Sequence, residues 1–149
     1  MNYKVCWTLL VAICLMGLAA CTTGDRTALA GSASEAITAA SGTPQSHAIG
    51  GAFASPLVAA VTKNGSPVSG VAVTFTAPAT TAPATEASGT FADTGNNAST
   101  ATTDANGLAT SAVFSANANV GAYTVTASAP SAQTGATFSL ANTTAAPAA

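Results

Sequence analysis

The sequence predicts an all-β chain folded as an antiparallel β-sandwich, and three observations lead to this prediction. Apolar residues recur at every second position in several short runs, which is typical of strands with one buried face. Residues that favour turns, above all Gly, Asn, Asp and Pro, bound each run. No stretch after residue 20 carries apolar residues at helical spacing. Short strands separated by turns in this way favour an antiparallel sandwich.

The first element along the chain is an N-terminal segment with the sequence MNYKVCWTLLVAICLMGLAAC. Lys4 precedes an apolar run from Val5 to Ala20, a layout typical of a secretory signal. The run is shorter than the roughly 20 residues that span a bilayer as a helix. We therefore expect residues 1–20 to be a signal peptide, with cleavage after Ala20.

The end of this segment, Leu18-Ala19-Ala20-Cys21, resembles the bacterial lipobox. The resemblance implies that the sulfur of Cys21 is lipidated, with acyl chains such as palmitate, and that the protein is anchored to a membrane. Thr22 after the cysteine further implies delivery to the outer membrane. The expected location is therefore the bacterial cell envelope. The alternative is an ordinary secretory signal that leaves Cys21 as a free thiol.

The exported chain is expected to hold one domain between two short tails. Residues 21–34 are small and polar and are expected to be a flexible tether, and residues 142–149 to be a disordered tail. The domain is expected to span residues 35–141. Its strands are expected in the runs PLVAAVT (56–62), VAVTFTA (71–77), LATSAVF (108–114), GAYTVTASA (121–129) and ATFSL (136–140).

Alternation predicts which side chains form the core. Val71, Val73 and Phe75 fall on one face of their strand, and Tyr123 and Val125 fall on one face of theirs. Between these strands, the turn sequence DANG ends with a glycine, Gly107, that is suited to the left-handed conformation closing a tight hairpin.

These features together resemble a bacterial immunoglobulin-like domain of the invasin and intimin repeat type. The matching elements are Pro67 and Gly70-Val71 before the VTF strand, the TDANG turn that ends at Gly107, and the GAYTVTA strand. The resemblance covers approximately residues 36–140. It implies an immunoglobulin-like sandwich of seven to nine strands with no catalytic site, in which Tyr123 is a core residue bonded to backbone. The chain departs from the family pattern because it carries a single copy and no membrane barrel.

Composition excludes several functions. Charged residues make up 5% of the chain, and its three Lys and Arg residues cannot form the basic face that nucleic acids require. The single histidine, His47, is next to Ser46, but neighbours in a strand point to opposite faces. Glu86 and Asp93 are expected to be solvated loop acids rather than a catalytic pair. We therefore expect no enzyme activity, no catalytic residues, no metal site and no cofactor.

One segment is a candidate ligand-binding loop: the Pro-interrupted, nearly uncharged sequence APATTAPATEAS at Ala77–Ser88. It is interpreted either as a flexible connection or as a recognition loop on a rigid scaffold, with Thr80, Thr81, Pro83 and Glu86 as the candidate binding residues. The expected function is a structural or adhesion and interaction module displayed by an envelope lipoprotein. The alternative is a carbohydrate- or protein-binding lipoprotein, whose partner would be an envelope or host surface protein or glycan.

Overall fold

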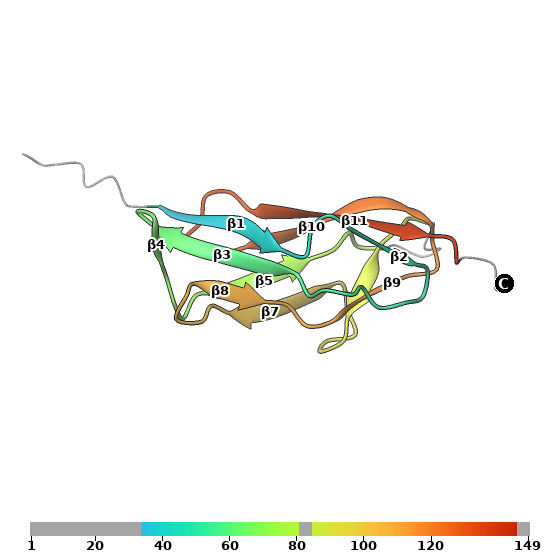
Figure 1. Cartoon of the computed structure of the whole chain (residues 1–149), viewed down its shortest axis with the longest axis horizontal. Helices are drawn as coiled ribbons and strands as arrows, with labels where there is room; N and C mark the ends of the chain where they lie inside the picture. The colour runs from blue at the N-terminus through green and yellow to red at the C-terminus, as the bar shows by residue number, and fades with distance from the viewer. Residues whose placement is uncertain (1–33, 81–84, 146–149) are drawn as a thin grey trace, which may run out of the picture. The chain divides into compact units, whose positions relative to one another are not determined.

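The computed structural model of the chain describes residues 34–80 and 85–145, and the described part consists of strands and connections with no helix (Figure 1). The strands are β1 (Glu35–Ser41), β2 (Gln45–Ala48), β3 (Val58–Lys63), β4 (Ser66–Pro67), β5 (Ala72–Thr76), β6 (Gly89–Phe91), β7 (Ala98–Thr102), β8 (Leu108–Thr110), β9 (Phe114–Ala116), β10 (Gly121–Ser128) and β11 (Ala136–Thr143). The predicted all-β class is therefore confirmed. The described part has eleven strands rather than seven to nine, partly because the run at 108–114 is divided between β8 and β9.

The strands form a larger sheet, a smaller sheet and a separate pair. The larger sheet has the order β2-β11-β10-β5-β7. In the smaller sheet β3 pairs with β1, β4 and β8, and the separate pair consists of β6 and β9. All pairings between these strands are antiparallel except one, since β2 runs parallel to β11. The chain changes sheets between β1 and β2, at Gly42 to Pro44.

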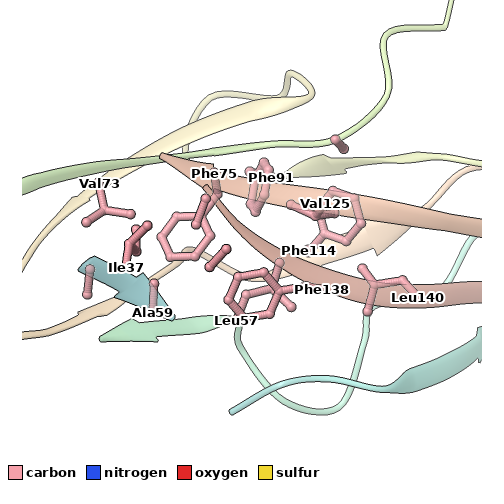
Figure 2. Close-up of a cluster of buried hydrophobic side chains, with 14 of the residues drawn as sticks. Ile37, Leu57, Ala59, Val73, Phe75, Phe91, Phe114, Val125, Phe138 and Leu140 are labelled. Atoms are coloured by element: carbon pink, nitrogen blue, oxygen red, sulfur yellow. The ribbon is translucent and has the colours of Figure 1, made fainter. Parts of the chain in front are cut away.

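A hydrophobic core lies between the sheets, and the predicted alternation explains how it forms. Val73 and Phe75 of β5 are fully buried, while Ala72 and Thr76 of the same strand are exposed. The four rings of Phe75, Phe91, Phe114 and Phe138 form the centre of the cluster, with the Phe91 and Phe114 centroids 4.6 Å apart (Figure 2). Aliphatic side chains such as Ile37 and Ala59 complete the core from the opposite sheet.

The outer face of the larger sheet is built from small, uncharged residues. Its outward positions on β5, β7, β10 and β11 hold only Thr, Ser and Ala. The register places Thr74 directly opposite Thr100, and their hydroxyl oxygens are 3.2 Å apart. Thr126 lies opposite Thr76 on one side and Thr137 on the other. The buried face thus carries the large apolar residues, and the exposed face carries β-branched hydroxyl residues.

The turn at 103–107 forms as predicted, but it does not close a hairpin. Gly107 has a φ of +74°, and a Cβ there would lie 2.6 Å from the carbonyl oxygen of Val61, so glycine is required on both counts. The strands on either side of the turn, β7 and β8, belong to different sheets. The predicted hairpin is therefore wrong: the turn carries the chain across the sandwich.

The C-terminal boundary also differs from the prediction. β11 continues to Thr143, beyond the expected domain end at residue 141. Asn142 is 1% exposed, because its side chain enters a buried hydrogen-bond network. The expected signal peptide and all of the expected tether except Ser34 lie outside the described residues.

Candidate functional site

The candidate binding residues are only partly within the described structure. The lipidation and cleavage residues, Cys21 and Ala20, lie outside it, as do Thr81 and Pro83 of the candidate loop. Thr80 and Glu86 are described, and both are exposed. The site can therefore be built from the two ends of the Pro-rich segment and from the residues that hold them.

The beginning of the Pro-rich segment is bonded to the chain before β7. The backbone N–H of Ala77 donates to the carbonyl of Asn97 at 2.8 Å, and the side-chain amide of Asn97 donates back to the carbonyl of Ala77 at 2.8 Å. At the next residue, the buried hydroxyl of Ser88 donates to the carbonyl of Pro78 at 2.6 Å. The bond from Ser88 joins the two ends of the segment at its base, and the bonds of Asn97 fix the start of the segment.

The end of the segment is bonded to the loop between β9 and β10. The carbonyl oxygen of Glu86 accepts hydrogen bonds from the side-chain amides of Asn117 at 2.9 Å and Asn119 at 3.1 Å. Glu86 is an exposed residue, and it contributes to the site through its backbone carbonyl. The sequence pattern singled out the carboxylate and did not identify this role.

Asn142 lies beneath these bonds and connects them to the core. Its side-chain nitrogen lies within hydrogen-bond distance of the Ser88 carbonyl at 2.9 Å, the Asn117 side-chain oxygen at 2.9 Å and the Asn119 carbonyl at 3.0 Å. Its side-chain oxygen accepts from the hydroxyl of Tyr123 at 2.9 Å. Burial raises the pKa of Tyr123, so this phenol remains a donor at neutral pH. Tyr123 thus bonds a side chain rather than the backbone acceptor that was expected.

A small cavity lies beside the start of the segment. It has a volume of about 250 Å³ and is lined by Ala79, Thr80, Gly89, Thr90, Gly95, Asn96 and Asn97. Among the described lining residues, the polar side chains are hydroxyls and amides, and none is charged. Such a surface suits a small neutral polar ligand, bound by hydrogen bonds rather than by ion pairs.

The titratable side chains described by the structure have separate local roles. His47 packs against the ring of Phe53, and its Nδ1 lies 3.0 Å from the carbonyl of Ala48, which requires a proton on Nδ1 for a hydrogen bond. Asp93 accepts from the hydroxyl of Ser99 at 2.7 Å, and Glu35 accepts from that of Ser131. Among residues 34–80 and 85–145, no group of three or more His, Cys, Asp and Glu side chains could hold a metal ion.

The asparagines of the network are the functional residues that sequence reasoning missed. Asn117 and Asn119 lie in the run NANVG between two of the predicted strands, and Asn142 lies in the segment that was expected to be a disordered tail. Asn117 and Asn119 bond Glu86, and Asn142 bonds Asn119; these partners are 23 to 33 residues apart along the chain. A local pattern carries no signal for such pairs. The unusual density of asparagine near 117–119 was the one available hint.

The described residues contain no helix long and apolar enough to cross a membrane. Comparisons of the chain with protein-family models, with characterised proteins and with solved structures find no match.

Proposed function

We propose that the protein is a non-enzymatic lipoprotein of the bacterial cell envelope that displays one immunoglobulin-like domain as a structural or adhesion and interaction module. Residues 1–20 direct export, and Cys21 carries the lipid anchor, at the outer membrane. Acylation with two or more chains gives a stable anchor, whereas a single chain binds only marginally. The partner in the membrane is the bilayer, and the partner of the domain is an envelope or host surface protein or glycan.

The strand order supports the immunoglobulin-like part of the proposal. The N-terminal strand is divided between the two sheets, with β1 against β3 and β2 parallel to β11. The larger sheet then runs from β11 through β10 and β5 to β7. Domains of the immunoglobulin type place consecutive strands in two sheets in a similar manner. The motifs at Pro67, Gly107 and the GAYTVTA strand agree with the same assignment.

One observation supports the proposal of a display module: polar and charged side chains near the loops form hydrogen bonds that stabilise the fold. Asp104 caps a turn, Asp93 bonds Ser99, and Asn142 holds three segments together. Catalysis instead requires a nucleophile or an acid and base that converge on a cleft. The carboxylates of Glu35, Asp93 and Asp104 are instead each used in a separate hydrogen bond, which favours packing and display.

The lipid anchor is tested by fractionation and mass spectrometry. The wild-type chain should sediment with membranes, and its mature N-terminal peptide should carry acyl groups on Cys21. The Cys21→Ser variant should lose these groups and appear in the soluble envelope fraction. A mature chain that begins at Cys21 with an unmodified thiol would contradict the proposal.

A second function, binding of a glycan or protein at the loops, is favoured by one specific observation. The cavity beside Thr80 offers hydroxyl and amide groups at one end of the sandwich, on a base that several hydrogen bonds hold in place. A rigid base with an exposed connection is the usual arrangement of recognition loops. Replacement of the loop, argued at the end of the Discussion, separates the two functions.

A further inference from the structure

The exposed edges of the two sheets differ in how they are protected from pairing with another chain. An open strand edge presents unpaired N–H and C=O groups, and proteins commonly protect it with charges, proline, bulges or a short strand. The edge strand β1 carries Glu35 and an irregularity between Ala39 and Ser41. The edge strand β2 has four residues and follows Pro44 directly. At the other edge of the smaller sheet, β4 contains Pro67 and β8 has three residues. β7 has five residues and carries no charge, proline or bulge: its sequence is ASTAT and its register with β5 is continuous.

The register shows which backbone groups of β7 are open. Thr103 donates to the carbonyl of Val71, and Ala77 donates to the carbonyl of Asn97, so these two pairs are hydrogen-bonded. Hydrogen-bonded pairs alternate along an antiparallel ladder. Ala98, Thr100 and Thr102 therefore direct their N–H and C=O groups away from β5, toward the edge of the sheet. The carbonyl of Ala98 accepts one hydrogen bond, from the hydroxyl of Thr94 at 2.7 Å, and its second lone pair can still accept a backbone N–H from another strand.

We propose that β7 pairs antiparallel with β7 of a second copy of this chain, with the two-fold axis at Thr100. In this arrangement Thr100 of one copy exchanges two hydrogen bonds with Thr100 of the other. Ala98 and Thr102 then form a pair on either side of the axis. The two larger sheets join into one continuous sheet across the dimer.

The chemistry of the edge favours a second copy as the occupant. An open strand edge recognises an extended backbone, and a two-fold axis makes the same strand its own partner. β7 contains no charged residue, so no like charges meet across the axis. Thr100 meets Thr100 at the axis, which places two β-branched side chains opposite one another as strands prefer, and Thr102 meets the small side chain of Ala98. A short strand pair buries less than a stable interface requires, so the dimer is expected to be weak in dilute solution.

Cysteine cross-linking tests the pairing in the full chain, expressed in bacteria and oxidised in isolated envelopes. The native chain has no cysteine after Cys21, so an introduced cysteine is the only one in the described domain. Paired residues in a hydrogen-bonded position have Cα atoms about 5.5 Å apart, within the range of a disulfide. Thr100→Cys should therefore give a covalent homodimer on a non-reducing gel, at least roughly fivefold above wild type.

Two control positions make the result specific. Thr124→Cys is exposed on the same face but lies in the middle of the sheet, and Ser46→Cys is exposed on the opposite edge strand. Neither should exceed the wild-type level of dimer. Equal cross-linking at all three positions would indicate collision, and cross-linking at Ser46→Cys alone would indicate the other edge. A Thr100→Cys adduct with a different protein would mean that the edge receives a foreign strand. Each of these results would overturn the proposal.

A second variant tests the backbone bonds themselves. The N–H of Thr102 points to the edge and is not bonded to β5, so Thr102→Pro removes a donor that only the dimer uses. Added to Thr100→Cys, it should lower the cross-linked fraction at least severalfold, whereas Thr102→Ser in the same background should not. The melting temperatures of the two double variants are compared to verify folding. Equal cross-linking by two folded variants would contradict pairing through the strand backbone.

Discussion

The turn at 103–107 and the Pro-rich segment at 77–88 both connect strands of the same sandwich, yet they are held in opposite ways. The interior of the turn is held by its own residues: a carboxylate oxygen of Asp104 accepts from the backbone N–H groups of Asn106 at 2.8 Å and Leu108 at 2.9 Å, while the two end residues of the turn also bond distant segments. The base of the segment is held largely by distant residues, Asn97, Asn117 and Asn119. The conformation of a connection can be predicted from its own residues when local hydrogen bonds hold it. Hydrogen bonds to distant residues form only in the completed fold, so a connection that depends on them cannot be predicted in this way.

The largest effect on both connections should come from the core strand they share. β5 leads into the Pro-rich segment and pairs with β7, which leads into the turn. Phe75→Ala removes a ring that is fully buried between Phe91 and Phe138 and should lower the free energy of unfolding by about 3 to 5 kcal/mol.

The matched control for this prediction is Thr76→Ala, the exposed neighbour on the same strand. It should change the stability by less than about 0.5 kcal/mol. Urea or thermal unfolding measures both variants. A loss well under about 1 kcal/mol for Phe75→Ala would mean that this ring does not lie in the core.

The second-largest effect should come from the hydrogen bonds between distant residues at the base of the Pro-rich segment. Asn142→Ala removes a buried amide that bonds the carbonyls of Ser88 and Asn119 and the hydroxyl of Tyr123, which should cost about 1 to 3 kcal/mol. The variant should also loosen the base of the Pro-rich segment, measured as faster cleavage there by elastase. Tyr123→Phe is the matched control, because it removes one bond of the same network and leaves the others. Unchanged cleavage in a destabilised Asn142→Ala chain would show that the network does not hold the segment.

Much of the architecture was predictable because it depends on neighbours in sequence. Alternation identified the buried face of β5 and β10, and the TDANG sequence located a turn with a left-handed Gly107. The same turn was assigned to a hairpin, because a local pattern cannot say which sheet the next strand joins. The parallel pairing of β2 with β11 and the burial of Asn142 were missed for a related reason. Both depend on residues that meet only after the two sheets have packed.

The third effect belongs to the turn and depends on pH. The backbone N–H of Leu108, followed by the bonds from Asn106, lowers the pKa of Asp104 from its ordinary value of 3.8. A carboxyl whose pKa is lower in the folded state adds stability above its unfolded pKa, and loses it as the pH falls through the folded value. Below pH 3.8, the melting temperature of the wild type should therefore decrease more than that of Asp104→Asn. The asparagine keeps an acceptor oxygen but does not titrate.

The pH prediction is measured by melting both chains from neutral pH into the acid range. Because Asp104 is exposed, we expect the difference between the two chains to be smaller than the effect of Asn142→Ala. Identical acid profiles would mean that the turn gains nothing from the charge. The turn would then be held by Gly107 and the backbone alone.

The smallest effect should come from the part of the Pro-rich segment above its base, and this experiment also separates the two proposed functions. Pro78, Glu86 and Ser88 provide the bonds that close the base, so the replacement is confined to residues 79–85, exchanged for Gly and Ser at the same length. A surface connection of unchanged length has nearly the same closure entropy, and the melting temperature should change little.

If the domain acts by display and packing, the proteins and glycans captured from envelope extract are also the same for both chains. If the segment and the cavity beside Thr80 form a binding site, one captured ligand is lost while the melting temperature is retained. Thr90→Ala, which changes another residue that lines the cavity and lies outside the segment, should then weaken capture of the same ligand. Selective loss in both variants would favour the binding function, whereas unchanged capture in both would favour display.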